Sequence, residues 1–355
     1  MLRALYHKLP EPIRRFRHDV QANCIALFWL VTNAVFDTWK YARFSSSLKK
    51  ATSQTNDQAL LTFYYHKIEK GLALPSPKRG FGVSWITSGF LPLLNSYAHT
   101  YGVDDVVVTC RKALEAYLAF HALSCPEAAS STIKAVQRYL DGSPSVSGDC
   151  SGGVMEVDAR VLEASWRIDF SRFASARHSV RVFAPDAVSH ELIERAVSIA
   201  QKAPSVCNRQ AWRVYGLTDP EAIRSALTCQ NGNAGFGDQI PCLLLVTCDN
   251  SVMLFNYERN QIWIDGGLFS MTLVYALQSV GLGSCCLNLC IPWSVEKRLG
   301  ALYRLPPSER PIMMIAAGHL PERLFVARSQ RKALSAALEW SDQTVVSNTR
   351  ADSKR

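Results

Sequence analysis

Ile240-Pro-Cys-Leu-Leu-Leu-Val-Thr-Cys248 is a continuous, almost wholly apolar run. A short run without alternating polar residues predicts a strand that is buried on both faces. Ile312-Met-Met-Ile-Ala-Ala317 is a second such run, and residues 212–217 form a third candidate strand. Residues 265–280 are apolar nearly all round at helix length, which predicts a central helix with Gly281 at its C′ position. Strands and helices that interleave in this way predict a layered α+β or α/β domain.

A break in composition divides the chain. Asp141-Gly-Ser-Pro-Ser-Val-Ser-Gly-Asp-Cys-Ser-Gly-Gly153 is rich in Gly, Ser and Pro, and no apolar period crosses it, which predicts a linker. We therefore predict four regions: a mainly helical N-terminal region over 1–140, a linker over 141–160, the layered domain over 161–340 and a polar tail over 341–355.

Helices are predicted on both sides of this linker. Residues 60–72 and 106–123 carry apolar side chains at helical spacing, and the Pro- and Gly-rich residues 75–82 interrupt regular structure between them. In the C-terminal part, Ser189 is a candidate N-cap for a helix that ends before Pro204.

Charge and cysteine content limit the class of protein. The 355 residues include 39 Lys and Arg against 30 Asp and Glu, a net charge of +9. The positive charge is spread out, so we expect a small anionic ligand rather than a nucleic-acid partner. Eleven cysteines without a secretory pattern fit reduced thiols in a cytoplasmic protein. There is no CxxC pair and no HExxH motif, and we expect no metal site.

One N-terminal segment has two interpretations. Residues 24–36 are nearly all apolar but are shorter than the roughly 20 residues that span a bilayer. Residues 1–50 hold nine Lys and Arg against three Asp and Glu, so the segment could touch a membrane surface weakly. We favour the alternative, a helix that packs on the rest of the protein.

Four short segments carry candidate binding groups. Arg177-His178-Ser179-Val180-Arg181 offers guanidinium and hydroxyl donors suited to a phosphate dianion. Ala203-Pro-Ser-Val-Cys-Asn-Arg-Gln-Ala-Trp212 offers amide groups suited to the edge of a heterocycle. Gly281-Leu-Gly-Ser-Cys-Cys-Leu-Asn-Leu289 follows a helix, which is the wrong order for a dinucleotide-binding turn. Residues 327–332 form a late basic cluster.

Taken in order, these segments resemble the FMN-dependent nitroreductase family over about residues 165–340. The matching features are Arg-His-Ser-x-Arg at 177–181, Ala-Pro-Ser-x-x-Asn-x-Gln-x-Trp at 203–212, Asp265, Gly-Leu-Gly-Ser at 281–284 and Ala-Gly-His-Leu-Pro-Glu at 317–322. The resemblance implies an α+β fold with a central sheet flanked by helices, preceded here by the helical N-terminal region.

The resemblance also implies roles for particular residues. Arg177, Ser179 and Arg181 would bind the ribityl phosphate of FMN with His178 beside them, and Arg331 would close on the same phosphate, with Arg328 as the weaker candidate. Pro204, Ser205 and Asn208 would line the isoalloxazine, with Gln210 near the ribityl chain or the ring edge. Backbone groups of the 286–289 loop would face the N5 and O4 edge of the flavin, namely those of Cys286, Leu287, Asn288 and Leu289. The family often has Pro-x-Glu-Gly or a glycine where this chain has Cys-Leu-Asn-Leu, and usually has Pro in place of Ala211. Arg209 is a candidate for charge stabilisation by position only, and we favour an exposed arginine there.

The function that the resemblance implies is an FMN-dependent oxidoreductase. NADH or NADPH would donate hydride, and a small electron-poor acceptor would take its place by a ping-pong route. No catalytic side chain is implied because the chemistry is centred on the flavin. Such proteins are typically homodimers with the flavin at the subunit interface.

The N-terminal region carries a second, looser resemblance. Tyr64-Tyr-His-Lys-Ile-Glu-Lys-Gly-Leu72 and Pro77-Lys-Arg-Gly-Phe-Gly82 resemble an extension on some bacterial nitroreductase-like proteins associated with surface-polysaccharide gene clusters. The alternative function is therefore a non-catalytic or specialised flavin-fold module for binding or assembly. His66, Lys67, Glu69 and Lys70 could cap a substrate slot, although a solvated helix is the favoured interpretation.

Overall fold

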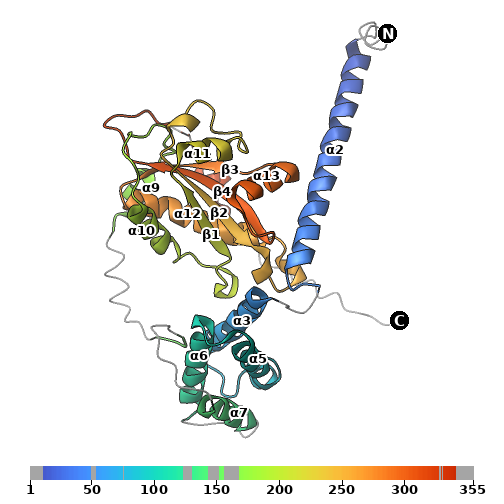
Figure 1. The fold of residues 1–355 in the computed structure, drawn as a ribbon, viewed down its shortest axis with the longest axis vertical. Coiled ribbons are helices and arrows are strands. Elements are labelled where there is room, and N and C mark those ends of the chain that lie inside the picture. Colours follow the sequence, from blue (N-terminus) through green and yellow to red (C-terminus); the bar gives the residue numbers. More distant parts are fainter. Residues whose placement is uncertain are drawn as a thin grey trace.

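The computed structural model describes residues 11–48, 53–74, 76–122, 130–142, 152–155, 168–327, 329 and 331–340. Figure 1 shows a sheet domain, a group of helices beside it, and a long N-terminal helix that projects away from both. Parts of the linker (143–151 and 156–160) and the whole polar tail (341–355) lie outside the described residues, so the predicted region boundaries stay predictions.

Within the described residues, the sheet has four strands: β1 (Trp212–Leu217), β2 (Cys242–Asp249), β3 (Gly283–Asn288) and β4 (Glu309–Gly318). They lie in the order β1-β2-β4-β3, and every neighbouring pair is antiparallel. The three predicted strands are confirmed as β1, β2 and β4. Because all pairs are antiparallel, the fold is α+β, and the α/β alternative is excluded for this sheet.

Helices cover both faces of the sheet. Leu243 and Leu245 face α11 (Pro220–Leu227) and α13 (Trp293–Tyr303), and Leu244 and Val246 face α10 (His190–Ala200) and α12 (Gln261–Ser279). Both sets of β2 side chains are fully buried. The burial of both faces explains why β2 has no alternating polar residues.

Two helix ends in this domain lie where capping residues in the sequence predicted them. Ser189 accepts a hydrogen bond from Leu192 N at 3.4 Å as the N-cap of α10, and Gly281 follows α12 with a positive φ of 88°. Both predictions are confirmed. A short helix α9 (Phe170–Ser175) precedes the first candidate binding segment, and 3₁₀ turns are present at residues 206–208, 237–239, 250–252, 256–258 and 334–336.

Helix α12, predicted to be buried on all sides, is buried on one side only. Phe269, Leu273 and Leu277 lie in the core. The opposite side exposes four large apolar side chains to solvent, namely Trp263, Ile264, Leu268 and Met271. An apolar helix surface that the chain itself leaves uncovered is available for an interface.

The predicted helical region is confirmed. It comprises α3 (Gln54–Leu72), α4 (Val83–Trp85), a π-helical turn (Ile86–Phe90), α5 (Leu91–Tyr101), α6 (Asp105–Ala122) and α7 (Ser130–Asp141). These helices bury a core of their own, which includes Leu61, Ile68, Phe90, Leu114 and Tyr117.

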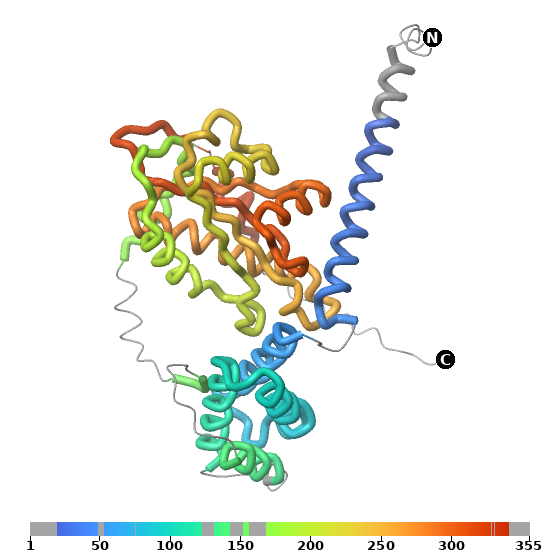
Figure 2. The backbone as a smooth tube through the Cα atoms, viewed as in Figure 1, coloured from blue at the N-terminus to red at the C-terminus, as the bar shows by residue number. Residues whose placement is uncertain are grey.

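Among the described residues, α2 (Glu11–Phe44) packs on the sheet domain by its C-terminal end. Lys40 Nζ lies 3.0 Å from Glu296 Oε1, and Arg310 contacts Glu296 at 2.7 Å and Asp37 at 2.8 Å. The remainder of α2 projects from this base, as the tube in Figure 2 shows.

The favoured interpretation is therefore wrong for residues 24–31, whereas Asn33 and Phe36 do contact Trp293 of the sheet domain. Residues 20–31 are all exposed, and they do not pack on the described protein. Within the described residues, Val20–Phe44 is the segment long and apolar enough to cross a membrane by length and composition, with a mean hydropathy of 1.3 in its most apolar window. The apolar run alone could not distinguish burial in protein from exposure, because both tolerate the same side chains.

Candidate functional site

A cavity of about 900 Å³ lies where the 177–179 segment meets α12, β3 and the C-terminal segment. Its lining includes five predicted residues: Arg177, His178, Ser179, Cys286 and Arg331. The volume is within the range of small-molecule and cofactor sites. The cavity thus brings two guanidinium groups from opposite ends of the domain to one space.

The edge of the sheet positions the 177–181 segment. Ser179 forms a parallel bridge with Ser284 of β3, and Val180 N donates to Ser284 O at 2.9 Å. Gly283 allows this close approach, because a Cβ there would lie 2.5 Å from Leu320 Cδ2 and 3.1 Å from Val180 Cγ2. Arg177 and Ser179 are therefore held against β3 rather than on a free loop.

Backbone donors on the outer edge of β3 face the cavity. Because Ser284 O points away from β4 toward Val180, the N–H and C=O of Cys286, two residues on, point to the same edge. The neighbouring Cys285 is buried, and burial raises the pKa of its thiol, while Arg181 and Arg177 act in the opposite direction. The Cys285 side chain lies in the core, so the group that suits this edge for hydrogen bonding to a bound ring is the backbone N–H of Cys286.

The 203–212 segment forms a second, separate feature. Cys207, Asn208 and Gln210 all have positive φ, at 47°, 53° and 47°. Such values cost free energy for residues other than glycine and persist only where neighbours hold them. Gln210 N donates to Ser205 Oγ at 3.0 Å and closes the turn.

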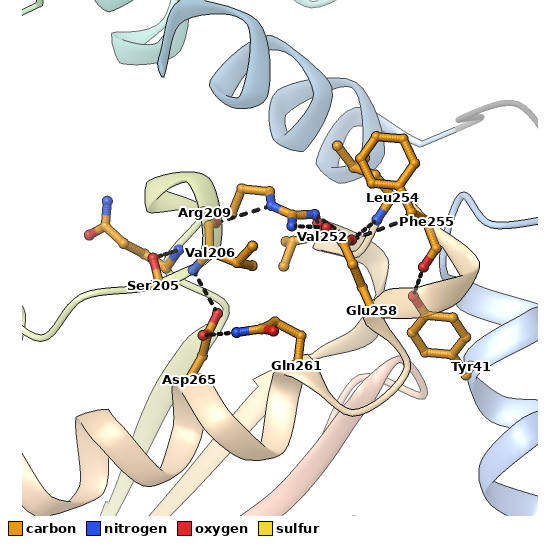
Figure 3. Close-up of polar contacts among 11 residues, drawn as sticks. Tyr41, Ser205, Val206, Arg209, Val252, Leu254, Phe255, Glu258, Gln261 and Asp265 are labelled. Carbon is orange, nitrogen blue, oxygen red and sulfur yellow. Dashed lines mark hydrogen bonds and ion pairs between the residues drawn. The ribbon is translucent and has the colours of Figure 1, made fainter. Parts of the chain in front are cut away.

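Asp265 of α12 holds the start of this turn. It is buried and accepts hydrogen bonds from Val206 N at 3.2 Å and from Gln261 Nε2 at 2.8 Å. Burial raises the pKa of Asp265, and the two hydrogen bonds oppose that effect. Figure 3 shows the carboxylate between Val206 and Gln261.

Arg209 holds the other side of the turn, and it is not the exposed arginine that we favoured. Its guanidinium lies against Glu258 with Nη1–Oε2 3.0 Å and Nη2–Oε1 2.5 Å, and Nη1 also donates to Val252 O at 2.7 Å (Figure 3). Glu258 also accepts from Leu254 N at 2.8 Å and Phe255 N at 3.2 Å. Arg209 therefore links the turn to the 252–258 segment, and its positive charge is paired with the carboxylate of Glu258.

The helical region covers the same turn. Helix α3 contacts the 206–208 turn, and its Tyr65 is buried, which raises the pKa of Tyr65 to about 12. Lys67 lies 4.1 Å from the ring centroid of Trp85, and Glu69 Oε1 accepts from Gly153 N at 3.2 Å. Lys67 and Glu69 are partly buried and make these contacts, whereas Lys70 is exposed, so the solvated-helix interpretation holds for only part of this segment.

The predicted residues outside the cavity are placed as follows. Pro204, Ser205, Asn208 and Gln210 belong to the held turn and do not line the cavity in this chain. Leu287 is part of the core, Asn288 O accepts from Gln230 Nε2 at 3.1 Å, and Leu289 lines another hollow at the base of α2. Arg181 is exposed and is not among the residues that line the cavity, and Arg328 is outside the described residues.

Sequence reasoning missed part of the lining. Met271, Val274 and Tyr275 of α12 form an apolar wall, and Ser329 lies beside Arg331. The helical spacing of the first three residues was visible, but it indicated only a buried face. Among the described residues, no group of three or more His, Cys, Asp or Glu is placed to hold a metal ion.

Comparisons with known proteins match the C-terminal region of the chain. Residues 174–229 match the model of the Nitroreductase family. The 4-nitrobenzoate reductase of Pseudomonas putida is 26% identical over 161 residues, covering 33% of this chain and 71% of that protein. Structural neighbours include a nitroreductase family protein from Streptococcus pneumoniae (TM-score 0.42, 19% identity, 49% of this chain and 100% of that chain). They also include an FMN-dependent nitroreductase from Clostridium difficile (TM-score 0.38, 20% identity, 44% and 91%). The family match lies within the sheet domain and supports an oxidoreductase function.

Proposed function

From the nitroreductase-family match of its C-terminal region, we propose that this protein is an FMN-dependent oxidoreductase. In this proposal it uses NADH or NADPH to reduce a small electron-poor acceptor by a ping-pong route. One relative is named for the reduction of 4-nitrobenzoate, an electron-poor aromatic compound, which supports this class of acceptor.

The cavity that joins Arg177 to Arg331 carries the proposal. A phosphate dianion needs forked, charged donors, and the cavity offers two guanidiniums together with the hydroxyls of Ser179 and Ser329. None of the described lining residues carries an acidic side chain. The donor set therefore fits the phosphate of FMN.

The remainder of the lining fits an aromatic ring system. Met271, Val274 and Tyr275 supply an apolar wall, and Cys286 supplies backbone groups opposite it. Bound FMN would supply two-electron transfer: it would accept electrons from NADH or NADPH, and after that donor has left it would pass them to the acceptor. The residues of this chain bind the phosphate, orient the ring against β3 and leave one side open for exchange of the two substrates.

A homodimer is part of the proposal. The exposed stripe on α12, formed by Trp263, Ile264, Leu268 and Met271, continues directly into the cavity wall at Met271, Val274 and Tyr275. A second copy that covers the stripe would also narrow the open side of the cavity. The turn at 203–212 would take its predicted role of lining the flavin from the partner copy, since it does not line the cavity of its own chain.

A cytoplasmic position for the sheet domain completes the proposal. The nicotinamide donors are cytoplasmic, and the nine cysteines among the described residues are all free.

The test is to purify the full chain, record its visible spectrum and titrate it anaerobically with NADH and with NADPH. We expect flavin absorbance that is bleached by at least one donor and restored by a nitroaromatic acceptor. A colourless protein that does not bind added FMN contradicts the proposal. A flavin-loaded protein that neither donor bleaches favours the binding or assembly module instead.

A further inference from the structure

The exposed part of α2 is apolar on every side. Residues 24–31 read Cys-Ile-Ala-Leu-Phe-Trp-Leu-Val, and at 3.6 residues per turn they encircle the helix about twice. The six large side chains among them are exposed, from 42% at Trp29 to 68% at Leu30. The remainder of the described protein therefore covers no side of this helix over these residues.

An all-round apolar helix needs an all-round apolar environment. A helix of this kind is buried either in a protein core or in a membrane. A second helix of another copy would cover only one stripe of its circumference. Lipid is the one occupant that covers every side at once.

The base of α2 shows that this helix belongs to the folded protein. Lys40 Nζ donates to Glu296 Oε1 at 3.0 Å and to Glu309 O at 2.6 Å, and Tyr41 OH donates to Phe255 O at 2.5 Å. Lys40 and Tyr41 are both buried. Cleavage of the helix as a leader peptide would remove these contacts of Lys40 and Tyr41 with the sheet domain. We therefore treat α2 as part of the folded protein.

Flanking residues have the composition of a membrane boundary. Arg14, Arg15 and Arg17 precede the apolar segment and suit anionic lipid headgroups. Trp39 and Trp293 lie at the base, each within 6.1 Å of the Phe36 ring between centroids. Tryptophan is enriched where a membrane meets water.

We propose that α2 inserts into a lipid bilayer and anchors the sheet domain at the membrane surface. Residues 33–41 of the segment Val20–Phe44 contact the sheet domain, so residues 20–32 are the part free to enter lipid, about 20 Å at 1.5 Å per residue against about 30 Å for the hydrocarbon core. Because the last turns of the segment contact the domain, the domain lies directly against the headgroups. This inference does not depend on the proposed flavin chemistry.

Flotation of the full-length protein with vesicles tests the anchor. The vesicles contain phosphatidylethanolamine with or without phosphatidylglycerol. We expect the protein to float with both and to stay bound in about 1 M salt, where charge attraction is screened. The double variant Leu27→Lys/Leu30→Lys changes two exposed positions, and we expect its bound fraction to fall about tenfold or more.

The matched control is Leu74→Lys/Leu302→Lys, which changes two exposed leucines outside α2 and should float as the wild type does. Circular dichroism verifies that all three proteins are folded. Three results would overturn the proposal. They are release of the wild type by salt, lipid-free oligomers that the α2 variant abolishes without any flotation, and an intact mass that lacks α2 in protein recovered from cells.

Discussion

Arg209 and Glu258 lie 49 residues apart in the chain and meet in a two-pronged ion pair that is almost fully shielded from solvent. The arginine comes from a turn with three residues at positive φ, and the glutamate comes from the segment that follows β2. The pair therefore ties a costly backbone conformation to the rigid part of the domain.

Removal of Arg209 should be strongly destabilising. Arg209→Ala leaves Glu258 buried without its counter-charge, a change that costs about 3–5 kcal/mol in the free energy of unfolding. The exposed pair Lys112–Glu115 is the matched control, and Lys112→Ala should cost about 1 kcal/mol or less. Urea unfolding measures both. Equal losses for the two variants would contradict the role given to the buried pair.

The two arginines of the cavity should both contribute to FMN binding. Each charge-assisted hydrogen bond is worth about 1.5–3 kcal/mol, so Arg177→Ala and Arg331→Ala should each weaken FMN binding about 10- to 100-fold. Arg195→Ala, on the exposed side of α10, is the charge-matched control and should bind FMN normally. Fluorescence titration of apoprotein gives the affinities. Normal binding by either cavity variant would remove that residue from the phosphate site.

Much of the fold could be predicted because its signals are local. The apolar run of β2, the Ser189 cap and Gly281 after α12 each depend on a few adjacent residues. The 177–181 segment could also be singled out, since its donors are consecutive. The bridge between Ser179 and Ser284 could not be predicted, because the spacing of residues along the chain does not indicate contacts between segments so far apart in sequence.

The errors arose where one pattern fits two environments. The apolar segment of α2 would look the same in a protein core, and only the folded chain shows that no described residue covers Leu27 or Leu30. Arg209 looked like a surface residue because its partner Glu258 is distant in sequence. In both cases the missing information was the identity of the neighbour in space.

Asp265 should make stability depend on pH. Burial raises its pKa in the folded state above the ordinary value of 3.8, so the folded protein holds the proton more tightly than the unfolded chain does. The contribution to the free energy of unfolding is full below 3.8 and declines as pH rises through the folded pKa.

Asp265→Asn should flatten this pH dependence. Urea unfolding from about pH 4 to pH 7 should show a smaller decline for the variant than for the wild type. The exposed Asp186→Asn serves as the control for removal of a carboxylate. Identical pH profiles for the wild type and Asp265→Asn would show that the buried carboxylate does not control stability.

Leu268→Arg should separate the proposed dimer. Leu268 lies in the middle of the exposed stripe on α12, and a two-fold interface would bury the new charge twice without a partner. The dimer dissociation constant should rise more than a hundredfold, because an unpaired buried charge costs about 3 kcal/mol or more.

Sedimentation velocity measures the mass, and FMN titration of the same samples should show weaker binding, since the partner turn is lost from the cavity. Ile199→Arg, an equally exposed apolar position on α10, should leave both properties unchanged. A Leu268→Arg protein that stays dimeric would place the interface on another surface.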